Sequence, residues 1–260
     1  MQISDGFELS VDDHVATLRI DRPGKRNAMS AAMWRALPGI VAPLAADRAV
    51  RVLVLTGAGG TFCSGADISE IAGLSEGGDD TGLTVAAERA LAEFPKPTIA
   101  MIEGFCVGGG CQLALACDLR LAALDARFGI TPAKLGIVYP LSSTRRLVDV
   151  VGRSTAKLML YSADLFDAAT ALRTGLVDEA HTSQALPERV YGLARTLAGR
   201  SQLTLAATKE IVDGRVDEAR FRRWQRESRQ EAAEGVAAFL EGRAARFSWS
   251  FGDHSGDMTS

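Results

Sequence analysis

The 260-residue sequence lacks the features that mark several large classes of protein. No apolar run approaches the roughly 20 residues that a membrane-spanning helix needs, so no membrane segment is expected. Basic residues number 29 against 32 acidic ones, a net charge of −3 that leaves no basic surplus for nucleic acid. The first residues, MQISD, lack the basic and apolar regions of a signal peptide. We therefore expect neither a membrane protein, nor a secreted protein, nor a nucleic-acid-binding protein.

Cysteine and histidine are also scarce. The four cysteines show no CxxC spacing, and small buried apolar side chains are their expected role, without a metal site. Because disulfides are not indicated, this usage fits a reducing, cytoplasmic environment. The remaining composition, 47% hydrophobic and 23% charged, is typical of a soluble globular protein with one large domain or two modest ones.

Glycine, in contrast, is concentrated in two short runs. Residues 104–112 (GFCVGGGCQ) follow an expected buried strand at 97–103 and open an expected helix at 112–117. Without Cβ atoms such a turn lets the backbone approach a ligand, and the first N–H groups of the helix have no helical partner. The turn could bind an anion or an oxygen that becomes negative during a reaction. Tight packing of helix on sheet is the alternative reading of the same glycines.

A second glycine-rich turn, residues 57–68 (GAGGTFCSGADI), follows another expected strand at 50–56. Two such turns, each offering one backbone N–H, are what a two-donor oxyanion hole requires. An expected strand at 15–21 and an expected helix at 27–46 precede this pair. Because strands and helices alternate along the chain, the sequence favours an α/β architecture.

Five segments resemble the crotonase (enoyl-CoA hydratase/isomerase) superfamily, in the same order along nearly the whole chain: RPGKRNAMS, SGADI, PKPTIAMIEGFCVGGGCQLALACDLRLAA, FGITPAKLG and VAAFLEGRAARF. The resemblance implies a ββα spiral core, expected over residues 1–195, and a helical C-terminal region over 196–260. It also implies packing of that region between subunits, as a homotrimer or a hexamer built from two trimers. The implied substrate is an acyl-CoA thioester, with coenzyme A as part of the substrate and no separate cofactor.

The same resemblance assigns site residues. The backbone N–H groups of Ala66 and Gly109 would bind the thioester carbonyl and stabilise an enolate. Residues implied to contact coenzyme A are Lys25 or Arg26 at a phosphate, Ala66 at the thioester, Asp67 and Ile68 near the adenine, and Arg243 and Phe247 reaching a neighbouring subunit. For Lys25 and Arg26 a solvated surface charge is the alternative. Asn27 is expected to hold the turn.

The sequence departs from the family where hydratases carry two glutamates. One position is Gln112 here, and an ungapped reading places Pro132 at the other. No aspartate or glutamate occurs between Asp125 and Asp149. A glutamine can hold a water molecule but cannot exchange protons near neutral pH. Because hydration needs groups that remove and deliver a proton, hydration by two glutamates is disfavoured.

Residues 131–140 (TPAKLGIVYP) resemble the corresponding loop of bacterial methylmalonyl-CoA decarboxylase, which makes Tyr139 a candidate for contact with a substrate carboxylate. Losing CO₂ from a malonyl-type thioester leaves an enolate and needs no general base. The relative, however, has a histidine at Ala66 and a glutamate at Gln112. The expected catalytic set is Ala66, Gly109, Gln112, Thr131 and Tyr139.

Three functions therefore follow from the sequence. The first is a lyase that decarboxylates a malonyl- or methylmalonyl-type acyl-CoA. The second is an enoyl-CoA hydratase or isomerase whose base is displaced to Asp79, Asp80 or Glu88. The third is a catalytically weak CoA-binding homologue that retained the fold.

Overall fold

The computed structural model describes residues 2–4, 6–70 and 82–251. Its helices and strands are, in chain order, β1 (Gln2–Ser4), β2 (Phe7–Asp12), β3 (Val15–Ile20), η1 (Pro23–Lys25), α1 (Ala31–Ala46), β4 (Val52–Gly57), η2 (Ile68–Glu70), α3 (Leu83–Ala92), β5 (Thr98–Ile102), β6 (Phe105–Val107), α4 (Gly109–Ala116), β7 (Leu119–Ala123), β8 (Arg127–Gly129), η3 (Pro132–Leu135), α5 (Leu141–Ser162), β9 (Phe166–Asp167), α6 (Ala168–Arg173), β10 (Glu179–His181), α7 (Leu186–Ala198), α8 (Gln202–Val212) and α9 (Glu218–Glu241). The α/β class expected from the alternating pattern is confirmed.

The described strands form two sheets. The larger has the order β1-β2-β3-β4-β5-β7-β10, and the smaller has the order β6-β8-β9. From β3 to β10 every neighbouring pair in the larger sheet is parallel, whereas β1, β2 and β3 pair antiparallel. Parallel neighbours direct their carboxyl ends to one edge, and the glycine-rich turn after β4 begins at that edge.

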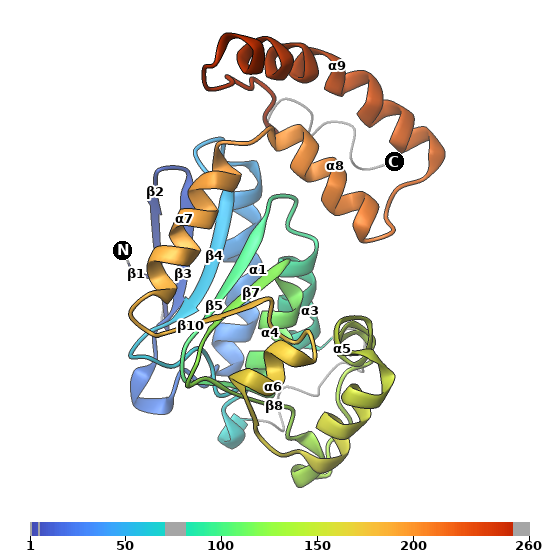
Figure 1. Cartoon of the computed structure of the whole chain (residues 1–260). Coiled ribbons are helices and arrows are strands. Elements are labelled where there is room, and N and C mark those ends of the chain that lie inside the picture. The colour runs from blue at the N-terminus through green and yellow to red at the C-terminus, as the bar shows by residue number, and fades with distance from the viewer. Residues whose placement is uncertain (1, 5, 71–81, 252–260) are drawn as a thin grey trace.

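Both faces of the larger sheet are covered, which explains the uninterrupted apolar run in β4. Leu53 and Leu55 point into a core shared with Trp34 of α1. Val52 and Val54, on the opposite face, pack in a second core against α7. Figure 1 shows α7 on one side of the sheet and α1 on the other. Alternate residues of one strand therefore hold two helices in place.

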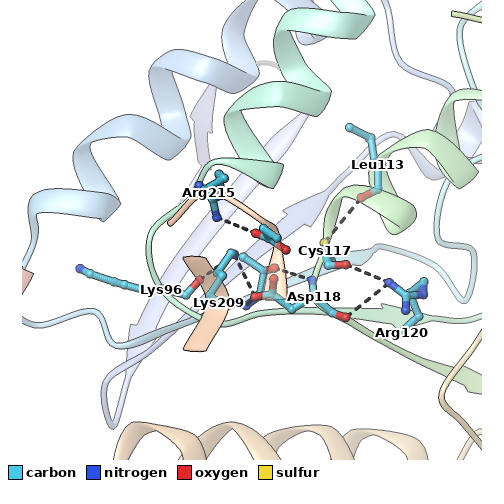
Figure 2. Close-up of polar contacts among 9 residues, drawn as sticks. Lys96, Leu113, Cys117, Asp118, Arg120, Lys209 and Arg215 are labelled. Atoms are coloured by element: carbon cyan, nitrogen blue, oxygen red, sulfur yellow. Dashed lines mark hydrogen bonds and ion pairs between the residues drawn. The ribbon is translucent and has the colours of Figure 1, made fainter. Parts of the chain in front are cut away.

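The helix α8 is attached to the amino ends of β5 and β7 by one lysine. Lys209 Nζ donates to Asp118 Oδ2 at 2.9 Å and to the Lys96 carbonyl at 3.3 Å (Figure 2). The same Asp118 oxygen accepts the Thr98 N–H at 2.8 Å. These bonds connect helix α8 to the sheet through residues that lie far apart in the sequence.

The helices α8 and α9 extend away from the sheet (Figure 1). On α9, Trp224 is buried against Trp249, and its Nε1 donates to Glu210 of α8 at 2.8 Å. Phe239 and Leu240 remain 86% and 78% exposed. None of the helices within the described ranges combines the length and apolar character that crossing a membrane requires.

Several expected boundaries shift. The helix after the glycine run begins at Gly109, three residues before the expected start at residue 112. The long element α5 consists of two helices that meet at Gly152, whose backbone is non-helical (φ 75°, ψ 162°). The expected division between core and C-terminal region at residue 195 falls inside α7, which ends at Ala198. Apolar spacing locates a helix face but does not mark the turn in which the helix starts or stops.

Candidate active site

The two glycine-rich turns, residues 57–68 and 104–112, are held together by backbone hydrogen bonds in a parallel arrangement. Cys63 and Cys106 form a parallel β-bridge. Cys63 N donates to Phe105 O at 2.9 Å, and Val107 N donates to Cys63 O at 2.9 Å. Three residues beyond each partner the chains reach Ala66 and Gly109. The register set by two buried cysteines therefore places the two expected oxyanion-hole residues side by side.

The backbone N–H groups of Ala66 and Gly109 are free to act as donors. Within the described ranges, neither donates to a protein acceptor. Gly109 is the first residue of α4, where a helical N–H has no partner in its own helix. A Cβ placed on Gly109 would lie 3.5 Å from the Ala66 nitrogen, which shows how closely the turns approach. Two adjacent free N–H groups can bind one oxygen and stabilise negative charge on it.

Glycine is required where the two turns touch. A Cβ on Gly65, whose φ is +104°, would lie 2.9 Å from the Val107 oxygen. A Cβ on Gly110 would lie 2.2 Å from the Cys63 oxygen. Since real Cβ atoms do not approach backbone oxygens so closely, these glycines have a packing role. These contacts support the packing reading of the glycine run. The oxyanion hole is compatible with it, because the same packing brings Gly109 close to the Ala66 N–H, and it remains a prediction.

A pocket of about 250 Å³ opens at these N–H groups. It brings together all five residues expected to be catalytic, although they come from three separate segments. Its described lining also contains apolar side chains and no aspartate or glutamate. The candidates Asp79 and Asp80 lie outside the described residues.

Tyr139 reaches the oxyanion-hole turn. Its hydroxyl donates at 3.3 Å to the Gly108 carbonyl, which belongs to the same peptide group as the Gly109 N–H. Burial, followed by the nearby Cys111 and Glu88, raises the pKa of the Tyr139 hydroxyl well above its usual value. The group therefore stays protonated and is a hydrogen-bond donor rather than a base. Contact of Tyr139 with a substrate carboxylate remains a prediction.

Gln112 is held by Glu88, which sequence reasoning considered only as a displaced base. Gln112 Nε2 donates to Glu88 Oε2 and to the Thr84 carbonyl, each at 3.1 Å. Glu88 is 1% exposed and forms an ion pair with Arg146 at 3.0 Å. It lies behind Gln112 and does not line the pocket. The signal available in the sequence was a carboxylate on the buried face of α3, in register with Val85 and Leu91.

The segment expected to meet coenzyme A lies against the Ala66 turn. Asn27 is fully buried; its Oδ1 accepts the Arg22 N–H and its Nδ2 donates to the Ala58 and Thr61 carbonyls. This confirms that Asn27 holds the turn. Lys25 and Arg26 are exposed beside it, with the Arg26 guanidinium over the Phe105 ring at 5.2 Å. Both cations are therefore accessible to solvent. Contact of either one with a phosphate of coenzyme A remains a prediction.

Asp67 and Ile68 continue the same turn. Ile68 is 70% exposed and lines the pocket, whereas the Asp67 carboxylate pairs with Arg22 at 2.8 Å. Hydrogen bonds from Ser69, and then from Arg22, lower the pKa of Asp67 to about 2. The carboxylate thus joins the Lys25 segment to the oxyanion-hole turn, and only its backbone is available for a ligand.

We expect Asp67→Asn to destabilise the fold at neutral pH, with the difference shrinking in acid. Because the folded pKa lies below the ordinary 3.8, the ionised carboxylate stabilises the fold above that value. This stabilisation is lost as the pH falls through about 2. Urea unfolding at neutral pH and near pH 3 measures the difference in unfolding free energy between the parent protein and Asp67→Asn. If this difference were the same at both pH values, it would contradict a role for the Asp67 charge.

Arg243 and Phe247 are not brought to this pocket within one chain. Arg243 pairs with Glu234 and Glu241, and Phe247 packs near Gly235. Figure 1 places α9 and the segment after it at the end of the molecule opposite α5, which follows the pocket loop. Contact with coenzyme A on a neighbouring subunit remains a prediction from the family resemblance.

All four cysteines are buried thiols. Burial raises the pKa of Cys63 and of Cys117 to about 12, and it raises the pKa of Cys106 well above its usual value. Cys111 Sγ donates to the Cys106 carbonyl at 2.8 Å. Their role as small apolar side chains is consistent with this burial, and the described residues hold no cluster of three or more metal-ligating side chains.

A thiol reagent should therefore label the folded chain only as fast as the chain opens. Since the thiolate is the reactive species, the raised pKa values suppress reaction in the folded state. The pKa of Cys63 and of Cys117 rises from about 9 in the unfolded chain to about 12 in the folded one, so their contribution lowers stability as the pH rises between these values. Labelling followed with and without urea tests this. Rapid labelling without unfolding would contradict the burial of all four.

Comparison with known proteins agrees with this geometry. Residues 10–249 match the sequence pattern of the enoyl-CoA hydratase/isomerase family. The chain is 34% identical to crotonyl-CoA hydratase of Syntrophomonas wolfei, over 92% of this chain and 96% of that protein. It is 33% identical to 2,3-dehydroadipyl-CoA hydratase of Escherichia coli, over 92% and 97%.

A solved structure of an enoyl-CoA hydratase/carnithine racemase from Magnetospirillum magneticum superposes with a TM-score of 0.88 at 30% identity, covering 94% of this chain and 96% of that one. The agreement thus extends over both sheets and the C-terminal helices, as the order of the matching segments indicated. The chain belongs to the enoyl-CoA hydratase/isomerase family, the crotonase superfamily.

Proposed function

We propose that the pocket binds an acyl-CoA thioester and that the N–H groups of Ala66 and Gly109 hold its carbonyl oxygen while an enolate forms. The observation that carries this proposal is the placement of two adjacent N–H groups, without protein acceptors among the described residues, at the end of one pocket. A preorganised pair of donors stabilises developing charge more than the neutral carbonyl, which is the condition for catalysis.

For the reaction itself, we infer chemistry of the hydratase or isomerase type on an enoyl-CoA thioester. The relatives that match over more than nine-tenths of the chain are hydratases of crotonyl-CoA and 2,3-dehydroadipyl-CoA. Gln112 and Pro132 supply no proton-exchanging group, so a displaced base is needed. Of the candidates that the sequence offers, Glu88 is enclosed behind Gln112. We therefore take Asp79 and Asp80, which lie outside the described residues, as the remaining candidates for the base.

Decarboxylation of a malonyl- or methylmalonyl-type thioester is the second candidate. It is favoured by the absence of any carboxylate among the described lining residues. Thr131 would donate its hydroxyl to the substrate carboxylate, and Tyr139 would do so after turning its hydroxyl away from the Gly108 carbonyl. In this reaction the bond between the α-carbon and the carboxylate breaks, and its electron pair passes to the enolate at the Ala66 and Gly109 donors. Water then supplies the proton to the α-carbon.

One assay separates these functions. The protein is incubated with crotonyl-CoA and with methylmalonyl-CoA, and 3-hydroxyacyl product and released CO₂ are measured. We expect hydration of crotonyl-CoA, which must disappear in Asp79→Asn or Asp80→Asn if either residue is the base. CO₂ release alone would instead establish decarboxylation. Tight binding of thioesters without turnover would indicate a CoA-binding homologue, and no binding would overturn the proposal.

We also propose that the chain assembles as a homotrimer or as a hexamer of two trimers. The support is the exposed apolar row of α9, formed by Val236, Phe239 and Leu240, on helices that extend from the sheet (Figure 1). Light scattering measures the mass directly. A charged residue at Phe239 should lower that mass, and a monomeric parent protein would contradict the assembly.

A further inference from the structure

We propose that Gln112 determines which acyl groups the pocket accepts, by presenting its side-chain oxygen as a hydrogen-bond acceptor, and that Glu88 is the positioning residue that fixes this orientation. The inference rests on the proposed function, since it takes the occupant of the pocket to be an acyl-CoA thioester. It assigns Gln112 a selective role where the family resemblance indicated only a missing glutamate.

The orientation of the Gln112 amide follows from its partners. The Thr84 carbonyl is an acceptor and cannot donate, and it lies 3.1 Å from one end of the amide. Glu88 Oε2 lies 3.1 Å from the same end. That end must therefore be the NH₂ group, because an amide oxygen would face two acceptors. The opposite end, Oε1, has no protein partner in the described parts of the chain, and Gln112 lines the pocket.

Glu88 can hold the amide because its own position is fixed from three sides. Ser143 Oγ donates to Glu88 Oε2 at 2.6 Å, Ser142 Oγ donates to the same oxygen at 3.1 Å, and Arg146 Nε donates to Oε1 at 3.0 Å. All these groups donate, so Glu88 serves as an ionised acceptor. A buried carboxylate with this many donors does not turn, and the amide that it binds does not flip.

The placement of Oε1 indicates what it recognises. Gln112 lies three residues after Gly109 on α4, and residues three apart lie on the same face of a helix, about one turn along. A thioester oxygen bound at Gly109 would thus have Oε1 near the acyl carbons next to the carbonyl. A lone pair there attracts a hydroxyl group and repels a carboxylate. The pocket should therefore favour an acyl group with a hydroxyl on the β-carbon over a plain acyl chain.

The test compares the dissociation constants of 3-hydroxybutyryl-CoA and butyryl-CoA by titration calorimetry. In the parent protein the hydroxylated thioester should bind about five- to tenfold more tightly, as one hydrogen bond allows. Gln112→Met should reduce this ratio to about one, because the hydroxyl group then has no acceptor at this position. A ratio near one in the parent, or an unchanged ratio in Gln112→Met, would overturn the inference.

Two variants of Glu88 separate positioning from stability. Glu88→Gln retains an oxygen for the Gln112 amide and should keep the ratio, although loss of the Arg146 pair lowers thermal stability. Glu88→Leu should lower thermal stability and also reduce the ratio of the two dissociation constants to about one. The control is Glu231→Leu, which removes another buried carboxylate with three hydrogen bonds, from Ser201, Ser248 and Trp249. It should lower stability and leave the ratio intact.

The outcomes remain distinct if a variant fails to fold. Should Glu88→Leu not fold, Glu88→Gln and Gln112→Met still decide the question. Loss of the ratio in Glu88→Gln with its retention in Gln112→Met would exclude the proposed arrangement. If the parent protein binds neither thioester, the proposed function itself fails, and this result differs from equal binding of both.

Discussion

Replacing Ala66 with proline should lower turnover of the acyl-CoA thioester by about 10²–10³-fold, the typical cost of losing one oxyanion-hole donor. Proline has no N–H, so the variant removes one of the two donors and leaves the Gly109 donor in place. The Ala66 N–H has no acceptor in the described part of the chain, so its loss breaks no hydrogen bond of the fold. Measurement of kcat and of thioester affinity locates the effect, which should appear mainly in kcat.

Ala66→Ser is the matched control for this variant, because it keeps the N–H and adds only one oxygen atom. It should retain most of the parent activity, and both variants should unfold at similar temperatures. If proline and serine at this position reduced kcat equally, the N–H would not be the group that matters. If neither reduced it, the oxyanion hole would lie elsewhere.

Gly110→Ala should cost about 1–3 kcal/mol of unfolding free energy, the usual cost of overpacking, and lower activity by about 10²-fold. The new Cβ would lie 2.2 Å from the Cys63 oxygen and 3.0 Å from its carbonyl carbon. Both are backbone atoms, so the contact cannot be relieved by rotating a side chain. The turn from Cys63 to Ala66 must move, and the two donors then no longer meet at one point. Urea unfolding and kcat measure the two effects.

Gly192→Ala controls for the general effect of adding a methyl group to a helix. Gly192 lies inside α7, and a Cβ there has nothing within 4 Å. Alanine is the better helix former by about 1 kcal/mol, so this variant should be slightly more stable and fully active. Equal stability and activity of Gly110→Ala and the parent would contradict the close contact between the two turns.

Much of the site could be predicted before the fold was known. The pair of strand–glycine turns and the matching family segments identified Ala66 and Gly109, and the structure places them side by side. The Asn27 turn was also foreseen, since a buried amide beside glycines commonly binds backbone groups. These features are local, and a run of residues with its immediate neighbours specifies them.

The arrangement around Gln112 could not be foreseen. The sequence showed that a carboxylate was missing at this position and suggested Glu88 as a displaced base. In the structure Glu88 is enclosed by Arg146, Ser142 and Ser143 and faces the amide instead of the pocket. Chain order cannot reveal this, because α3, α4 and α5 meet only when the sheet brings them together.

The sequence by itself determined the α/β class, the family and the two backbone donors, because strand periodicity, glycine turns and the order of the segments are properties of neighbouring residues. Only the tertiary structure decided that the Cys63–Cys106 register brings those donors to one pocket, and that Glu88 lies behind it. Long-range pairing and burial set the direction in which a side chain points. The same glutamate could act as a base or hold a neighbouring side chain in position. The donors Ser142, Ser143 and Arg146 around it favour the second role.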